Sequence, residues 1–317
     1  MPVKMKMTPR ERAVAALNCK IPDQIPTFEL EFQLTREYIG KDYLRQHELE
    51  GLSKAETDIK LHENAEFMIE LFDRLEYSVI PIHHLNFENQ LETARIIRKI
   101  SGEKYMLTKH GDGTYGIPDG NHMYDFAYRL ADDPDGMKQQ AENMANWTIE
   151  SNKKAVDAGF DSFILCADYC YNSGPFLSPA MFREFITPYL KKIIKSIRDS
   201  GAYAIKHTDG NIMPILDQLA ECEPHGIHSL DPMARVDIKE VKKLIGDKIC
   251  LCGNVNCALM QTGTDEEVVA SAEYAIEHGK PNGGFIFATS NCPFWGLPLD
   301  RYLLVLDVWK KHRDYDH

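Results

Sequence analysis

The chain has 317 residues, of which 44% are hydrophobic and 26% are charged. This composition is that of an ordinary folded protein and excludes collagen-like and disordered chains. The net charge of −12 and the lack of a basic patch exclude a nucleic-acid partner. No stretch approaches the ~20 apolar residues that span a bilayer, and no apolar run follows the basic N-terminus as in a signal peptide. The eight cysteines are too sparse for a disulfide scaffold, so we expect free thiols and a cytoplasmic protein.

The N-terminal part predicts a helical extension followed by a strand with an acidic face. Residues 8–11 (TPRE) combine a cap residue, a proline suited to the first turn and a glutamate that completes a capping box. Residues 25–32 (IPTFELEF) then alternate apolar side chains with Glu29 and Glu31, which is the period of a strand. Two readings of the acidic pair stay open: a salt-bridged or solvated strand edge, or a supplementary metal ligand or general base.

The next segment predicts a short strand at residues 77–82 and a helix around residues 91–100. Residues 104–121 carry four glycines and alternating side chains, which is typical of a β-hairpin excursion. The adjacent His83 and His84 point apart if they lie on a strand, so a joint site is not expected.

From residue 135 onward, helical and strand patterns alternate regularly. The predicted strands are residues 162–168, 203–208, 226–230, 249–252 and 285–289. This alternation predicts parallel strands joined by crossover helices. Seven or eight such units fit a single closed (β/α)8 TIM-type barrel better than an open sheet. Since no Ser/Gly/Pro-rich linker and no block of charge interrupts the chain, we expect one domain over residues 1–317.

Polar side chains gather where the predicted strands end, and in a barrel of this class the loops at these ends build the active site. His207 and Asp209 are two residues apart, so both side chains leave on one face, which can be the lumen. With the thiolate of Cys292 they would give zinc three ligands and leave a fourth position open for substrate. The alternative is that His207 and Asp209 only hydrogen-bond to neighbouring loops and that Cys292 is a small buried apolar residue.

Other residues at these ends are candidates for contacts with substrate. We expect Asp168 to have a catalytic role beside Glu29 and Glu31. The candidates for substrate binding are Tyr169, Asn254, Asn256 and Asn291. Three cysteines, Cys250, Cys252 and Cys257, have a spacing that an iron-sulfur or structural zinc site could use. Packing in a strand and loop is the favoured interpretation.

Long stretches of the sequence resemble the uroporphyrinogen decarboxylase superfamily, in the same order and over almost the whole chain. The segments that carry the resemblance are MTPRERAVAALNCKIPDQIP, ADYCYNSGPFLSPAMFREFITPYLKKI, KHTDGNIMPILDQL, LDPMARVDIKEVKKLIGDKICLCGNVN and GGFIFATSNCPFWGLPLDRY. The resemblance implies a TIM-type barrel. It also implies one of two activities: decarboxylation of porphyrinogens, or methyl transfer with corrinoid proteins, often through zinc.

The decarboxylase pattern differs from this sequence at two places. The family places an arginine-rich segment after the first strand, where this chain has residues 29–33 (ELEFQ), and an aspartate near the second strand, where it has residues 78–81 (SVIP). An acidic pair would repel a substrate that carries many carboxylates. The resemblance is therefore closer to the methyltransferase branch than to true uroporphyrinogen decarboxylases.

The methyltransferase pattern is a His-x-Cys-Gly segment plus a distant cysteine as zinc ligands. His207 and Cys292 match it, while Asp209 takes the place of the middle cysteine. An aspartate still ligates zinc but donates less electron density than a thiolate, which disfavours activation of a thiol such as coenzyme M. Transfer from an ether or amine donor, with the metal as a Lewis acid, remains compatible.

The sequence therefore predicts a zinc-dependent methyltransferase that acts on a small methyl donor or acceptor. Its methylcobalamin would be carried by a separate corrinoid protein. The alternatives are a decarboxylase of a carboxylated substrate and a non-catalytic ligand-binding barrel. The oligomeric state is left open, a homo-oligomer included.

Overall fold

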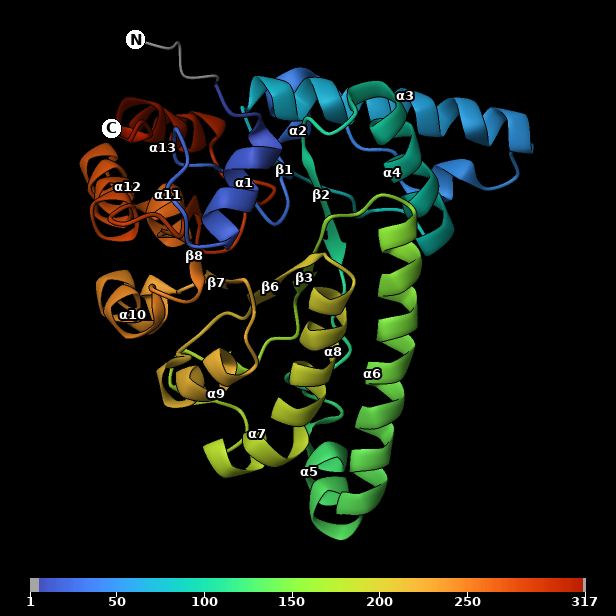
Figure 1. Cartoon of the computed structure of the whole chain (residues 1–317), viewed down its shortest axis with the longest axis vertical. Coiled ribbons are helices and arrows are strands. Elements are labelled where there is room, and N and C mark those ends of the chain that lie inside the picture. The colour runs from blue at the N-terminus through green and yellow to red at the C-terminus, as the bar shows by residue number, and fades with distance from the viewer. Residues whose placement is uncertain (1–5, 316–317) are drawn as a thin grey trace.

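The computed structural model describes residues 6–315, which form an α/β fold around one large parallel sheet (Figure 1). Seven strands pair in the order β1-β2-β3-β6-β7-β8-β9, and every pairing is parallel. Their bounds are β1 (Val79–Pro81), β2 (Met106–His110), β3 (Ser162–Leu165), β6 (Tyr203–His207), β7 (Gly226–Ser229), β8 (Cys250–Val255) and β9 (Phe285–Thr289). A separate two-stranded hairpin is formed by β4 (Cys170–Tyr171) and β5 (Gly174–Pro175).

Helices surround the sheet in Figure 1, as expected for crossover connections between parallel strands. They are α1 (Pro9–Leu17), α2 (Thr35–Ile39), α3 (Lys54–Arg74), α4 (Phe87–Ser101), α5 (Met123–Asp132), α6 (Pro134–Asp157), α7 (Pro179–Phe185), α8 (Thr187–Asp199), α9 (Leu216–Glu221), α10 (Ile238–Ile245), α11 (Cys257–Thr262), α12 (Asp265–Gly279) and α13 (Leu299–His312). Short 3₁₀ turns lie at η1 (Gln46–Leu49), η2 (Met213–Ile215) and η3 (Pro232–Ala234). No helix within residues 6–315 is both long and apolar enough to cross a membrane.

The predicted first strand, residues 25–32, is not a regular strand in the structure. It makes one parallel bridge, between Thr27 and Phe287 of β9. The Phe287 N–H donates to the carbonyl oxygen of Pro26 at 2.9 Å, and the Ser78 N–H donates to that of Thr27 at 2.8 Å. Because Ser78 directly precedes β1, this segment lies between the two outer strands of the sheet. Pro26 has no N–H to donate, which helps to keep the ladder short.

The predicted hairpin over residues 104–121 is wrong. Residues Met106–His110 instead form β2, which pairs in parallel with β1 on one side and β3 on the other. The first four side chains of β2 are all buried, so both faces of this strand are covered, as in a parallel sheet. The glycines that suggested a hairpin belong to the loop that follows β2.

Two consecutive helices, α7 and α8, lie between β3 and β6. The helix α7 ends at Phe185 and α8 begins at Thr187, with Ile186 between them. Pro188 in the first turn of α8 lacks an N–H, so it cannot donate to the carbonyl oxygen of Glu184 as a continuous helix would require.

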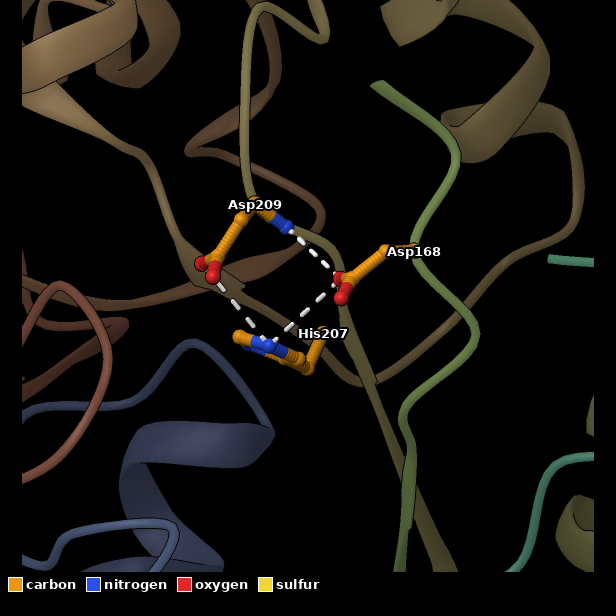
Figure 2. A group of neighbouring side chains, drawn as sticks. All are labelled: Asp168, His207 and Asp209. Atoms are coloured by element: carbon orange, nitrogen blue, oxygen red, sulfur yellow. Dashed lines mark hydrogen bonds and ion pairs between the residues drawn. The ribbon is translucent and has the colours of Figure 1, made fainter. Parts of the chain in front are cut away.

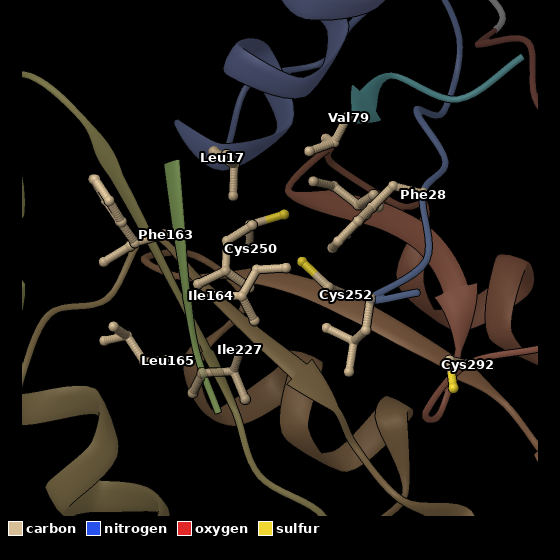
Figure 3. Packing of buried hydrophobic residues seen from close by; sticks show 14 of the residues in the cluster. Leu17, Phe28, Val79, Phe163, Ile164, Leu165, Ile227, Cys250, Cys252 and Cys292 are labelled. Carbon is tan, nitrogen blue, oxygen red and sulfur yellow. The ribbon is translucent and has the colours of Figure 1, made fainter. Parts of the chain in front are cut away.

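A continuous apolar core fills the space within the sheet and between the sheet and the helices. Figure 3 shows Cys250 and Cys252 inside it, among aliphatic and aromatic side chains that include Leu17 and Phe28. Both cysteines are fully buried. All eight cysteines of the chain are free thiols, and the packing interpretation of this pair holds.

Candidate metal centre

Asp168, His207 and Asp209 come together at the carboxyl ends of two neighbouring strands (Figure 2). His207 is the last residue of β6, and Asp168 follows β3, with which β6 pairs. The Nε2 atom of His207 lies 3.7 Å from Oδ1 of Asp168 and 3.7 Å from Oδ1 of Asp209. One ligand atom from each of the three residues lies within 4.8 Å of the other two, which is the only such group within residues 6–315. The predicted pairing of His207 with Asp209 on one face is thus observed.

The carboxylate of Asp209 is held in place by residues from two other strand ends. Oδ1 accepts a hydrogen bond from Ser229 Oγ at 2.8 Å, and Oδ2 accepts one from Asn291 Nδ2 at 2.6 Å. Burial raises the pKa of Asp209 to about 6, and the nearby carboxylates of Asp168 and Asp231 act in the same direction. The group therefore concentrates negative charge that a bound cation would neutralise.

Ser229 itself has a strained backbone, with φ = +87°. This value lies in the region that side chains other than glycine rarely adopt. The strained residue is the one whose hydroxyl donates to Asp209. Backbone outliers of this kind are frequent at functional sites.

The ring of His207 contacts the ring of a second buried histidine, His228 of β7. Their Nδ1 atoms are 3.0 Å apart, so one ring donates a hydrogen bond and the other accepts it. Burial lowers the pKa of His207 well below its usual value and that of His228 to about 3, and both rings are neutral at pH 7. If His207 donates from Nδ1, its Nε2 lone pair faces the two aspartates. That tautomer is the one a metal ligand needs.

This tautomer leaves the other ring with its hydrogen on Nε2. The Nε2 atom of His228 is buried and has no hydrogen-bond partner. A buried N–H without a partner is unfavourable, so the arrangement is one that a cation on His207 would have to stabilise.

The loop that carries Asp168 is fixed by a fully buried lysine, Lys206, next to His207 in β6. Its Nζ donates to Asp112 Oδ2 at 2.8 Å and to the carbonyl oxygens of Leu165 and Ala167 at 3.0 and 2.8 Å. Asp112 also accepts from the Ala167 N–H at 3.0 Å. All three protons of the ammonium group are thereby used, and the chain just before Asp168 is tied down. Lys206 is not among the residues predicted for the site, although a charged residue inside an apolar strand is a signal of such a role.

Tyr169, predicted to bind substrate, has a structural role instead. Its side chain is fully buried, and its hydroxyl lies 2.6 Å from Thr114 Oγ1. The Nζ atom of Lys206 lies 3.9 Å from the centroid of its ring. The residue packs under the loop that carries Asp168 and is not part of the Asp168–His207–Asp209 group.

The sequence predicts Cys292 as the third member beside His207 and Asp209. In the structure Cys292 is not part of the three-residue group, and Asp168 is its third member. The physical reason lies in the loop after β9, which directs the amide of Asn291 to Asp209. The thiol of Cys292 is 8% exposed, and its carbonyl oxygen lies 3.9 Å from Cys257 Sγ. Burial raises the pKa of the Cys292 thiol, and nearby carboxylates add to this. Figure 3 shows Cys292 well apart from the core cysteines.

The two glutamates predicted as catalytic residues lie in different surroundings, because the segment that carries them is not a regular strand beyond the bridge at Thr27. Glu29 is buried and accepts a hydrogen bond from the Thr289 N–H at 3.0 Å. Burial raises the pKa of Glu29 to about 8, against hydrogen bonds from Thr289 and Tyr302. It ties its segment to β9 and α13 and lies outside the metal group. Glu31 has a side chain that is 28% exposed.

The other asparagines predicted to bind substrate use their amides to hold loops. Asn254 Nδ2 donates to the carbonyl oxygen of Leu230 at 2.9 Å. Asn256 caps α11 by accepting from the Ala258 N–H at 2.9 Å. Of the predicted amides, Asn291 is the one that contacts the group.

The family model of uroporphyrinogen decarboxylase (URO-D) matches residues 119–312, which is more than half of the sequence. The chain belongs to the uroporphyrinogen decarboxylase family. The predicted family is confirmed.

The curated relatives of this family member include two methyltransferases and one decarboxylase. Methylcobamide:CoM methyltransferase MtaA of Methanosarcina barkeri is 29% identical over 125 residues, which cover 39% of this chain and 35% of the relative. Methylcobamide:CoM methyltransferase MtbA of Methanosarcina mazei is 26% identical over 139 residues, 43% of this chain and 38% of the relative. A uroporphyrinogen decarboxylase of Aromatoleum aromaticum is 25% identical over 179 residues, 53% and 44% of the two chains. The matched stretches thus span less than half of each curated relative, and two of the three relatives are methyltransferases.

A solved structure matches this family member along its whole length. It is a methyltransferase from Methanosarcina mazei, with a TM-score of 0.75 and 18% identity, and the match covers 96% of this chain and 99% of the other. At this identity the match establishes the shared fold.

Proposed function

We propose that this protein is a zinc-dependent methyltransferase that moves a methyl group between a small methylated substrate and a separate corrinoid protein. The observation that carries the proposal is the Asp168–His207–Asp209 group at the carboxyl ends of β3 and β6. The two methylcobamide:CoM methyltransferases among the relatives support the choice of reaction. Methylcobalamin would arrive on the partner protein.

The side chains of the group fit a divalent cation. One neutral imidazole nitrogen and two carboxylate oxygens make a set of three ligands, and a fourth position is left for the substrate. The Nδ1–H of His207, held by His228, would orient the ring, as partners of metal-bound histidines do. When bound, zinc supplies Lewis acidity toward the heteroatom that carries the methyl group.

The chain's own residues would then orient the donor and hold the site open. Ser229 and Asn291 fix Asp209, while Lys206 fixes the loop of Asp168, so little rearrangement is needed when a ligand arrives. Since Asp209 replaces a thiolate, we place the emphasis on ether or amine donors and not on activation of a thiol.

The proposal also includes features of the fold and its setting. We infer that the segment around Thr27 stands in for an eighth strand and closes the sheet into a barrel, since it bonds to both β9 and the residue before β1. We further infer one domain over residues 1–317 and a cytoplasmic location, in keeping with eight free thiols.

Metal analysis of the purified protein, with a methyl-transfer assay, tests this proposal. We expect stoichiometric zinc in the wild type, and methylation of cob(I)alamin bound to a corrinoid protein. His207→Ala and Asp209→Asn should lose the metal and the activity but keep the far-UV circular dichroism spectrum. Cys292→Ala should retain zinc, because the thiol lies outside the group. Full zinc in both site variants would refute the assignment.

A further inference from the structure

His110 is the last residue of β2, and its side chain leaves the sheet on the same face as that of His207. In the register of the parallel strands, His110 pairs with Ile164 of β3, which in turn pairs with Ile205 of β6. Paired residues of parallel strands point to one face, and residues two apart in a strand share a face. The side chains of His110, Ile205 and His207 therefore project the same way.

This shared face is the inner face of the curved sheet. His228 pairs with His207 in the register, and its ring centroid lies 5.8 Å from that of Phe28, in the segment that bridges to β9. Because β8 and β9 separate His228 from this segment along the sheet, the contact crosses the interior. His110 and His207 thus face one space at the carboxyl ends of their strands. Burial is the main cause of the low pKa of His207, and a proton on His110 would lower it further, so the two rings are within electrostatic reach.

The ring of His110 is held by stacking and keeps its nitrogens free. Its centroid lies 3.9 Å from that of His83, with an angle of 28° between the planes. His83 is itself fixed, because its Nε2 donates to the carbonyl oxygen of Leu30 at 2.9 Å. Lys109 Nζ donates to the backbone carbonyl oxygen of His110, and within residues 6–315 neither ring nitrogen of His110 has a hydrogen-bond partner. The side chain is exposed, so a ligand can reach it.

The groups around His110 leave it free to change its protonation state. Desolvation lowers the pKa of His110, and the charge of Glu31 acts in the opposite direction. Lys109 lowers this pKa and Asp112 raises it, both less strongly than Glu31. Burial lowers the pKa of each neighbouring histidine and keeps it uncharged at pH 7, which holds for His83, His84 and His207. An imidazole with a fixed plane, free nitrogens and no bound partner is suited to proton transfer.

We propose that His110 is the general acid that protonates the leaving oxygen when a methyl ether is the donor. The assignment deepens the proposed function and rests on it. An ether is the donor that needs this group most, because an alkoxide or phenoxide leaves poorly without a proton.

The step balances as follows. Cobalt(I) of the partner's corrinoid attacks the methyl carbon, and its electron pair forms the cobalt–carbon bond. The carbon–oxygen bond breaks, its electron pair stays on oxygen, and that oxygen takes the proton of the His110 imidazolium. Cobalt is oxidised from the I to the III state, the ether becomes an alcohol, and the ring becomes neutral. In the reverse direction the neutral ring accepts the proton of the alcohol.

The dependence of methyl transfer on the leaving group tests the proposal. The purified full chain with zinc is given cob(I)alamin and either anisole or 4-cyanoanisole, whose cyano group stabilises the leaving phenolate. We expect His110→Gln to slow transfer from anisole about 100-fold and transfer from 4-cyanoanisole far less, with unchanged zinc content. A merely structural role would slow both ethers equally. His122→Gln, an exposed histidine just before α5, is the matched control and should have no effect.

A second measurement does not depend on turnover. In side-chain NMR of the protein with zinc, the His110 signal is identified by its absence in His110→Gln, and we expect it to titrate with pH. A ring that stops titrating when zinc binds would be a metal ligand and not the acid.

The two proposals can fail separately. Equal slowing of both ethers by His110→Gln, or loss of the His110 titration with zinc, would overturn the role of His110 and leave the proposed function intact. Wild-type protein that binds zinc but transfers from neither ether would overturn the ether donor, and this role with it. Wild-type protein that binds no zinc would refute the proposed function itself.

Discussion

At the scale of single residues, the chemistry depends on which atom of each ring or carboxylate is free. The two histidines 3.0 Å apart at Nδ1 illustrate this, because only one tautomer of His207 leaves Nε2 available. Under the proposed function, His228 would act on the metal through His207 and would be a positioning residue.

We predict that His228→Phe weakens zinc binding by 10- to 100-fold, the usual cost of losing the partner of a metal-bound histidine. Competition with a chromophoric chelator measures the affinity. The melting temperature of the metal-free protein should not fall in parallel, because the substitution also removes the buried Nε2 that has no partner. Unchanged zinc affinity in a folded variant would show that the His207 ring is oriented without this contact.

Glu29 gives the stability of the protein a pH dependence. Its folded-state pKa of about 8 is above the usual 4.5, so its contribution is fully present below about pH 4.5 and is lost as pH rises through 8. Each pH unit between the unfolded and the folded pKa costs about 1.4 kcal/mol, and the loss levels off above pH 8. We predict that Glu29→Gln, relative to the wild type, gains stability as the pH rises from about 5 to 8.

Urea unfolding at a series of pH values measures this difference. Glu63→Gln, on the exposed face of α3, serves as the control for the substitution itself. Parallel stability profiles for the wild type and Glu29→Gln would mean that the carboxyl of Glu29 is already ionised at pH 7.

At the scale of elements, a buried polar side chain of β6 supports the loop after β3. Lys206 donates to the carbonyl oxygens of Leu165 and Ala167, which precede Asp168, and is paired with Asp112. A similar buried ion pair lies at the opposite end of β3, where Asp161 pairs with Arg98 and Arg10.

We predict that Lys206→Met lowers zinc affinity at least tenfold and destabilises the fold by about 3 to 5 kcal/mol, since Asp112 would be left buried and unpaired. Asp161→Asn is the matched control: it should destabilise the fold through the same kind of ion pair and leave zinc affinity unchanged. If Lys206→Met does not fold, the double variant Lys206→Met with Asp112→Asn removes both charges and still releases the loop. Wild-type zinc affinity in that double variant would contradict the role assigned to Lys206.

The sequence predicts the helices and strands well where buried side chains recur with a regular period along the chain. It predicts them poorly where they do not. Residues 285–289 were predicted as a strand and form β9, because an apolar run covered on both faces has few alternatives. The hairpin predicted at residues 104–121 is wrong, because its glycines lie in the loop after β2 and do not form a turn between two antiparallel strands. In loops the direction of a side chain has no period, so the sequence could not tell that Asn291, and not Cys292, faces Asp209. The partner of Lys206 lies 94 residues earlier in the chain, beyond any local pattern.

At the scale of the whole molecule, the metal group joins strands that are far apart in sequence. Asp168 follows β3, His207 ends β6, and Asp209 is held by residues from the ends of β7 and β9. A cation bound there links four parts of one sheet. Under the proposed function, a metal that binds the folded state and not the unfolded chain would stabilise the folded state by mass action.

We therefore predict that zinc raises the melting temperature of the whole chain and that the increase grows with zinc concentration. At a free zinc concentration 100 times Kd the stabilisation is about 2.7 kcal/mol, which corresponds to a few degrees for a chain of this size. Differential scanning calorimetry of the metal-free protein with added zinc measures the shift, and a chelator should reverse it. Asp209→Asn should abolish the shift, whereas Asp217→Asn, an exposed aspartate of α9, should preserve it. A shift of the same size in Asp209→Asn would mean that zinc binds elsewhere on the protein, and the group at the ends of β3 and β6 would then lose its assignment.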